Sequence, residues 1–279
     1  MNIAILFLVF NRPDTTKKVF ESIKSVKPKR LYLSCDGPRS NNFDDTKKIK
    51  EVKEILRNID WDCELYTRFR EKNLGCKLAV IDGINWFFEK EEEGIILEDD
   101  TLPSKSFYYF CQFLLEKYRE NKVVMHIGGY KPSHVGKDNF TISFTRATHI
   151  WGWATWRDRW KHYKGDLTSE KMLDLLPDFE YFSRKGKIKK RVKILEQINN
   201  NKLDTWDYQW NFAVRTNSGL AIRPCVNLVK NIGFGHVDAT HTLKRNKVNE
   251  AVEMDIKNLK LPPWIMPNRN LERQFERRL

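Results

Sequence analysis

Short, mostly apolar runs alternate with amphipathic segments through the first half of the chain. In 15–25, for example, Val19, Phe20 and Ile23 are spaced as on one face of a helix. The predicted strands are 2–10, 30–34, 62–68, 94–97 and 123–127, and the predicted helices are 15–25, 44–59, 77–89 and 104–121. This alternation predicts an α/β protein with a Rossmann-like mixed sheet, mostly parallel and flanked by helices.

The strand predicted at 94–97 ends in three consecutive acids, Glu98, Asp99 and Asp100. Ligands of open α/β sheets collect outside the carboxyl ends of the strands. Adjacent carboxylates repel one another unless a cation lies between them, and Mg²⁺ or Mn²⁺ held by one or two carboxylates usually completes its shell with substrate phosphates. We therefore expect a metal–diphosphate site here, and the alternative is a solvated acidic turn.

Other polar residues follow the first two predicted strands, namely Asn11 and Arg12 after the first and Asp36 after the second. Their positions predict that they lie at the same edge of the sheet as the acids. The glycine signature G-x-G-x-x-G is absent after the first strand, and so is the Gly-Lys-Ser/Thr phosphate loop. Metal and basic side chains are then expected to hold the phosphates. The alternatives are a surface turn capped by Arg12 and an ordinary turn at Asp36.

The net charge indicates which classes of partner suit the protein, and the cysteine content indicates its cellular compartment. The formal net charge of +13 suits a polyanion, which includes nucleic acid, an anionic membrane and a phosphorylated substrate. The basic residues are dispersed and match no nucleic-acid recognition motif, so we expect no nucleic-acid partner. Five widely spaced cysteines favour a reducing compartment. We expect a cytoplasmic protein, with contact at the inner face of the membrane left open.

The second half is rich in aromatic residues, and its densest stretch is 150–156, which includes Trp153. Indole rings there could stack on a sugar or belong to the core. Helices are predicted at 170–176 and 181–200, and the second has a basic face that suits either solvent or anionic lipid. Another charged helix is predicted at 269–279.

An acid lies among large aromatic residues in the segment 205–210. Burial beside such residues raises a carboxyl pKa toward the range of a general base, so Asp207 is the predicted base and Asp204 the second choice. A buried, hydrogen-bonded structural Asp is the alternative. The segment 233–241 is punctuated by glycines, as a closing loop would be.

The ordered motifs Asn-Arg-Pro, Cys-Asp-Gly, Asn-Leu-Gly and Glu-Asp-Asp, followed by Trp-Asp-x-x-Trp, resemble a known family. They are similar to nucleotide-diphospho-sugar glycosyltransferases of the GT-A fold, in particular the inverting N-acetylglucosaminyltransferase I group and its bacterial relatives. The resemblance covers about residues 2–242. The histidine that helps to read uracil in the animal enzymes has no counterpart at 78–81, which weakens the case for uracil.

The resemblance implies a role for each matching residue. Arg12 and Asp36 would hold the nucleotide, Asp100 would bind the metal directly, and Asp99 and Glu98 would contact the ribose and the donor sugar. Trp153 belongs to a segment that lines the donor and acceptor cleft in the family. Asp207 would deprotonate the acceptor. A late histidine, His236 or else His241, would complete the metal shell or contact the diphosphate.

Together these inferences predict a Mn²⁺- or Mg²⁺-dependent inverting glycosyltransferase. It would move a sugar from a nucleotide-diphosphate donor, with UDP favoured, to a hydroxyl of a glycan or glycolipid in surface polysaccharide synthesis. The alternatives are a sugar-nucleotide pyrophosphorylase-like nucleotidyltransferase and a non-catalytic basic nucleic-acid-binding protein. The expected domain covers 1–243, with a nucleotide-sugar half (1–127) and an acceptor half (128–243). The remainder, 244–279, is an extension that packs on the body or contacts a partner.

Overall fold

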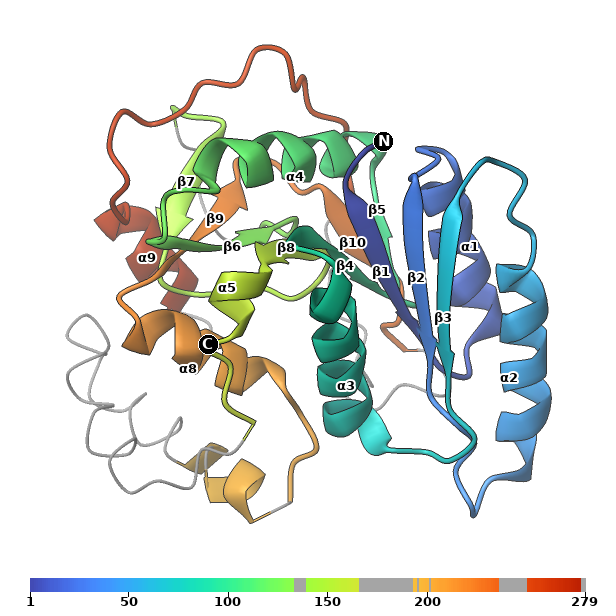
Figure 1. The fold of residues 1–279 in the computed structure, drawn as a ribbon. Coiled ribbons are helices and arrows are strands. Elements are labelled where there is room, and N and C mark those ends of the chain that lie inside the picture. The colour runs from blue at the N-terminus through green and yellow to red at the C-terminus, as the bar shows by residue number, and fades with distance from the viewer. Residues whose placement is uncertain (133–138, 166–192, 195, 201, 236–249, 277–279) are drawn as a thin grey trace.

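The protein is a mixed α/β structure built around an eight-stranded sheet (Figure 1). This computed structural model describes residues 1–279 except 133–138, 166–192, 195, 201, 236–249 and 277–279. The sheet has the order β3-β2-β1-β4-β8-β6-β9-β7, in which β8 and β7 run opposite to the other strands. The predicted fold class, a mostly parallel mixed sheet flanked by helices, is confirmed.

The strands of the large sheet are β1 (Ala4–Val9), β2 (Arg30–Cys35), β3 (Glu64–Phe69), β4 (Glu93–Glu98), β6 (Val124–Gly128), β7 (Ile142–Thr145), β8 (Trp153–Trp156) and β9 (Leu220–Pro224). A second, two-stranded sheet pairs β5 (Thr101–Pro103) with β10 (Val229–Asn231). The described helices are α1 (Pro13–Lys24), α2 (Phe43–Leu56), α3 (Gly75–Lys90), α4 (Lys105–Tyr118), α5 (Arg157–Trp160), α8 (Asp207–Thr216) and α9 (Arg269–Glu276).

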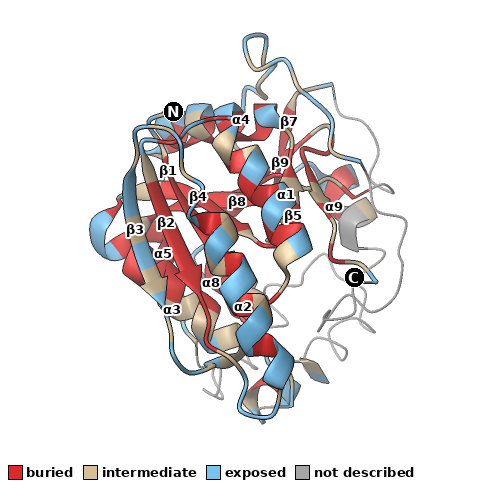
Figure 2. Ribbon diagram, turned by 90° about the vertical axis from the view of Figure 1, so that its right-hand side faces the viewer, coloured by how far each residue is buried: buried red, intermediate tan, exposed pale blue. Residues whose placement is uncertain are grey.

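The central strand β1 is buried on both faces and separates two hydrophobic cores. Successive side chains of a strand point to opposite faces. Ile5, Phe7 and Val9 therefore pack with α1, α2 and α4, whereas Leu6 and Leu8 pack with α3 and α8. Figure 2 shows the resulting layers, in which red buried strands lie behind helices whose outer faces are blue and exposed.

All of the helices and strands predicted in 1–127 are present, and their ends differ by a few residues. The sequence did not indicate β5, β7, β10, α5 or α8, and it assigned the residues of β8 to an aromatic ligand-binding segment. That strand lies between β4 and β6 and is antiparallel to both. The helix predicted at 170–176 lies outside the described residues, as does most of 181–200, of which 193–194 and 196–199 are described and helical.

The described part of the C-terminal extension packs on the body. The Glu253 carboxylate accepts hydrogen bonds from the backbone N–H groups of Lys105 and Ser106, at 2.9 and 2.8 Å, and so caps α4. Near the end of the chain, Glu272 accepts from the backbone N–H of Arg146 at 2.9 Å. The extension is therefore tied to both α4 and the residues after β7.

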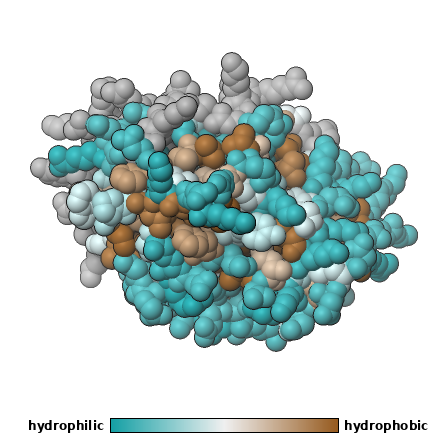
Figure 3. All heavy atoms as spheres, turned by 90° about the horizontal axis from the view of Figure 1, so that it is seen from above, coloured by the Kyte–Doolittle hydropathy of each residue, from teal (hydrophilic) through white to brown (hydrophobic). Residues whose placement is uncertain are grey.

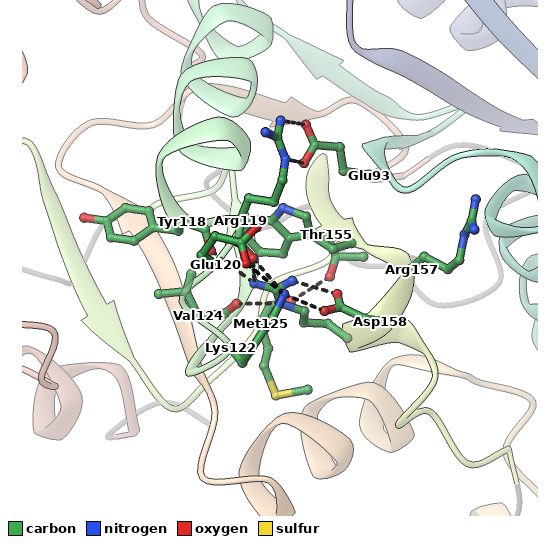
Figure 4. A network of polar contacts seen from close by, with 12 residues as sticks. Glu93, Tyr118, Arg119, Glu120, Lys122, Val124, Met125, Thr155, Arg157 and Asp158 are labelled. Atoms are coloured by element: carbon green, nitrogen blue, oxygen red, sulfur yellow. Dashed lines mark hydrogen bonds and ion pairs between the residues drawn. The ribbon is translucent and has the colours of Figure 1, made fainter.

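A buried arginine, Arg159, lies at the opposite end of α4. Figure 4 shows the neighbouring residues Tyr118, Arg119 and Asp158. The Arg159 guanidinium donates to the backbone carbonyl oxygens of Tyr118, Arg119 and Asn121, at 3.1, 2.6 and 3.2 Å. It also donates to the Asp158 carboxylate at 2.7 Å. Carbonyl groups at a helix C-terminus lack partners within the helix, so this contact satisfies them and joins the end of α4 to α5.

None of the described helices combines the length with the hydropathy that a bilayer span requires.

Candidate functional site

The carboxyl ends of β1, β2 and β4 bring the sequence-predicted polar residues together. β1 pairs in parallel with both neighbours, with Leu8 opposite Glu98 and Val9 opposite Cys35. Beyond the strands, the backbone N–H of Phe10 donates to Asp99 Oδ2 at 3.2 Å. The predicted convergence at one edge of the sheet is therefore present.

Arg12 lies directly against the acidic motif. Its Nη1 is 2.9 Å from Asp100 Oδ2 and 3.4 Å from Asp99 Oδ1, and only 13% of its side chain is exposed. Burial alone would lower the pKa of the guanidinium, but the charges of Asp99 and Asp100 and the hydrogen bond to Asp100 raise it above its usual value. Arg12 is thus the counter-ion of the motif and not a surface turn cap.

Glu98 differs from the two acids that follow it. Burial, together with the negative charges of Asp100, Asp99 and Asp207, raises the pKa of its carboxyl well above the usual range. The turn after it is closed by Thr101, whose hydroxyl donates to the Glu98 carbonyl and accepts from the Glu98 N–H, both at 3.0 Å. Glu98 therefore holds its proton more tightly than a free carboxyl does, whereas Asp99 and Asp100 pair with Arg12.

Asp36 holds the turn that leads into α3. Its Oδ1 accepts from the Gly37 and Leu74 backbone N–H groups at 2.9 and 3.1 Å, and its Oδ2 accepts from Asn73 Nδ2 at 2.9 Å. Burial raises the pKa of Asp36, and the backbone hydrogen bonds oppose that shift. A Cβ at Gly37 would collide with the backbone of Lys72, so glycine permits this close approach.

Asn11 does not face a ligand as predicted. Its side chain is buried and donates from Nδ2 to Asp45 Oδ1 at 2.8 Å. Asp45 also accepts from Arg39 Nε at 2.7 Å. The prediction that Asn11 contacts the nucleotide does not fit this geometry, because its amide is used to join the turn after β1 to α2.

Trp153 lies in the core. Its side chain is 0% exposed, and its ring stacks on His126 and Trp206 with centroids 5.1 and 5.6 Å apart. A side chain enclosed in this way packs between β8 and α8. This burial favours the core alternative over the predicted contact of Trp153 with the donor.

Asp207 is the first residue of α8 and is half-buried. The Thr205 hydroxyl donates to Asp207 Oδ1. Trp206, the residue before Asp207, stacks on Trp153 with centroids 5.6 Å apart, and Trp153 pairs with Ile96 of β4, two residues before the acidic motif. The segment of the predicted base therefore packs beside the strand that ends in the acids.

Asp204, the second choice for the base, instead caps a helix. No feature of the sequence indicated this role. Its two carboxylate oxygens accept from the backbone N–H groups of Cys76 and Lys77 at 2.9 and 3.0 Å. These are N–H groups of the first turn of α3, so Asp204 caps that helix from a distant segment.

The segment after β10 lies against the acidic motif. The Ile232 N–H donates to the Asp100 carbonyl at 2.8 Å, and a Cβ at Gly233 would collide with Asp100 Oδ2. Glycine at this position is therefore required by the close approach to Asp100. The predicted ligands His236 and His241 lie outside the described residues.

Comparisons with known proteins give similarity at the level of the fold. No protein-family model matches the sequence, and no curated protein matches it. A UDP-glucose pyrophosphorylase complexed with UDP-glucose is 10% identical with a TM-score of 0.43, covering 84% of this chain and 94% of that one.

Two other solved structures are similar to a lesser degree. A 4-diphosphocytidyl-2C-methyl-D-erythritol synthase from Anaerococcus prevotii is 10% identical with a TM-score of 0.38, covering 69% of this chain and 84% of that one. HddC from Yersinia pseudotuberculosis is 8% identical with a TM-score of 0.34, covering 56% and 78%. Likeness at this level assigns no reaction.

The described residues fit a divalent cation only when it is shared with a ligand. No group of three His, Cys, Asp or Glu side chains in the described part of the chain could hold a metal by itself. Asp99 and Asp100 supply two carboxylates, which is the usual protein share for Mg²⁺ that also binds substrate phosphates. These two carboxylates therefore suit a metal ion that also binds the diphosphate of a substrate.

Proposed function

We propose that this protein transfers a glycosyl group from a nucleoside-diphosphate sugar to an acceptor hydroxyl. The observation that carries the proposal is the packing of the Asp207 segment against the strand of the acidic motif: Trp206 stacks on Trp153, and Trp153 pairs with Ile96 of β4. It brings a carboxylate from the second half of the chain to the strand ends where Arg12 and Asp100 lie. A glycosyl transfer needs both parts, a cationic site for the leaving diphosphate and a base for the acceptor.

The strand-end groups would bind the diphosphate. The Arg12 guanidinium matches phosphate oxygens in charge and geometry. When bound at Asp100, Mn²⁺ or Mg²⁺ would neutralise the charge that develops on the leaving diphosphate. Glu98 would lie near the sugar, and its raised pKa would favour a carboxyl that can donate a hydrogen bond there.

Asp207 would accept the proton of the attacking hydroxyl. The hydrogen bond from Thr205 orients its carboxylate, and the ring of Tyr208, the next residue, is 39% exposed. An exposed aromatic ring beside a base suits a sugar acceptor, because sugars pack their apolar faces on such rings. A single base with in-line attack predicts inversion at the anomeric carbon, consistent with a glycan or glycolipid acceptor.

Nucleotidyl transfer is the second candidate, and the UDP-glucose pyrophosphorylase whose fold is similar is named for that kind of activity. It would use the same edge of the sheet to bind a nucleotide sugar. Its phosphates would have to be held without a glycine-rich loop, because β1 leads directly into Phe10-Asn11-Arg12-Pro13. Nucleic-acid binding has no motif in the sequence to support it.

Contact with an anionic membrane remains a separate proposal. The net charge of +13 supports it, and the outer face of α4 exposes Tyr109 and Phe113. Figure 3 shows this face, where brown hydrophobic side chains are surrounded by teal hydrophilic ones. Cosedimentation with phosphatidylserine vesicles, compared with phosphatidylcholine vesicles, tests it directly.

One experiment separates the two enzymatic candidates. The protein is incubated with Mn²⁺ and UDP-glucose, UDP-galactose, UDP-N-acetylglucosamine or UDP-N-acetylgalactosamine, with and without pyrophosphate. Glycosyl transfer to water or a glycan acceptor releases UDP without pyrophosphate. Nucleotidyl transfer instead consumes pyrophosphate and forms UTP and a sugar 1-phosphate. Formation of UTP alone would replace our proposal with the second candidate, and neither product, without binding of UDP, would refute a UDP-sugar as the substrate of either reaction.

A further inference from the structure

The first turn of α3 lacks a cap of its own. Its N-cap residue is Leu74, whose side chain has no hydrogen-bonding group. N–H groups at the start of a helix have no partner within the helix, so an acceptor must come from elsewhere. Asp204 supplies it, since both of its carboxylate oxygens accept from this turn, from Cys76 at 2.9 Å and from Lys77 at 3.0 Å.

The same turn is held from the other side by Asp36. The Leu74 N–H is 3.1 Å from both Asp36 oxygens, and Asn73 donates to Asp36 Oδ2 at 2.9 Å. Within the turn, Asn73 Oδ1 accepts from the Gly75 N–H at 3.1 Å. Residues 73–77 therefore join the end of β2 to the segment that contains Asp204.

That segment leads directly into the predicted base. Thr205 follows Asp204 and donates its hydroxyl hydrogen to Asp207. Trp206 is buried and packs against Trp153. The place of Asp207 therefore depends on two anchors, the buried Trp206 ring on one side and the contact of Asp204 with α3 on the other.

We propose that Asp204 is a positioning residue, which ties the Asp207 segment to the α3 turn that also holds Asp36. The inference rests on the proposed function and extends it, because it links the predicted nucleotide side of the site with the predicted base. Both oxygens of Asp204 are engaged by backbone N–H groups, so its use is to accept these hydrogen bonds and not to take a proton from an acceptor.

Two substitutions at one position test the proposal. Asn caps helices about as well as Asp, whereas Ala does not. Asp204→Asn should lower kcat less than Asp204→Ala does, because its single side-chain oxygen still accepts one of the two hydrogen bonds from α3. Asp204→Ala should lower kcat by about tenfold or more, because a base displaced by a fraction of an ångström loses efficiency steeply. Asp207→Asn provides the comparison for loss of the base itself.

Hydrogen exchange of the peptides that cover 73–77 and 204–210 supplies a readout that needs no substrate. Exchange should rise in both peptides in Asp204→Ala and rise less in Asp204→Asn, which keeps one of the two hydrogen bonds. If Asp204→Ala does not fold, Gly75→Ala disturbs the same contact from α3, because Gly75 has φ +80° and an added Cβ would lie 3.0 Å from Asp204 Oδ2.

The outcomes distinguish this inference from the proposed function. Equal loss of kcat in Asp204→Asn and Asp204→Ala would overturn the positioning role and make Asp204 the proton acceptor. Unchanged kcat and unchanged exchange in Asp204→Ala would overturn it too, while the proposed function would stand. Failure of wild type to bind UDP with Mn²⁺ in a thermal-shift assay would instead refute the proposed function, and the exchange data alone would then decide whether the contact exists.

Discussion

Arg12 Nη1 lies 2.9 Å from Asp100 Oδ2, so the residue predicted to hold the diphosphate is paired with the residue predicted to bind the metal. A divalent cation and a guanidinium compete for the same carboxylate oxygen. The negative charge of Asp99 and Asp100 is therefore offset in part by the Arg12 guanidinium. Phosphates that attract Arg12 would free Asp100 for a metal.

Removal of Arg12 should separate metal binding from nucleotide binding. In Arg12→Ala, Mn²⁺ should bind more tightly without nucleotide, since no internal cation competes, while UDP should bind about tenfold more weakly through loss of a charged hydrogen bond. Electron paramagnetic resonance of free Mn²⁺ and calorimetry with UDP measure the two affinities. Arg12→Lys is the control and should lie between. Weaker Mn²⁺ binding in Arg12→Ala would contradict the role as counter-ion.

Asp100 should be required for the metal-dependent part of nucleotide binding. Asp100→Ala is expected to reduce the stabilisation that UDP gives in the presence of Mn²⁺ to the level seen with EDTA. The thermal unfolding midpoint measures this, with Asp44→Asn, on the exposed start of α2, as the control. Full metal-dependent stabilisation in Asp100→Ala would remove Asp100 from the metal site.

The sequence predicted elements correctly where the spacing of apolar residues matches the face that is buried in the structure. The strands and helices of 1–127 followed from apolar periodicity, and the meeting of Arg12, Asp36 and Glu98 at one edge followed from their places after parallel strands. Trp153 could not be assigned in this way. An aromatic residue in a short buried strand and one in a sugar-binding wall have the same sequence pattern.

Hydrogen bonds between residues far apart in the sequence could not be predicted either. Nothing near Asp204 indicates that its carboxylate caps α3, because the uncapped helix start at Leu74 lies in another part of the chain. Likewise, Asn11 follows a strand as a ligand-binding residue would, but its side-chain amide donates a hydrogen bond to Asp45 on α2. Only the three-dimensional arrangement decides whether a polar side chain at a strand end serves a ligand or the fold.

The Asp45 ion pair should give the protein a defined sensitivity to acid. Its hydrogen bond with Arg39, despite opposing burial, lowers the pKa of Asp45 from 3.8 to about 2. A depressed pKa means that the folded state binds its proton less readily, so this stabilisation is complete above pH 3.8 and is lost as the pH falls toward 2. The unfolding midpoint of Asp45→Asn should be lower than that of wild type at pH 6, and the gap should close toward pH 2.

The matched control for acid sensitivity is Asp62→Asn, which changes an exposed carboxyl before β3. It should follow the wild-type dependence on pH. A constant difference between wild type and Asp45→Asn from pH 6 to pH 2 would show that the contribution of Asp45 is packing and not charge.

Trp153 offers the sharpest contrast between a ligand-binding and a structural role. Trp153→Ala should destabilise the fold by about 3–5 kcal/mol, because it removes a fully buried ring stacked between His126 and Trp206. Denaturant unfolding measures this, and Trp153→Phe, which keeps an aromatic ring, should lose less. At a temperature where Trp153→Phe is fully folded, its affinity for UDP should equal that of wild type. A loss of UDP affinity without a loss of stability would restore the sequence-based assignment of Trp153 to the donor site.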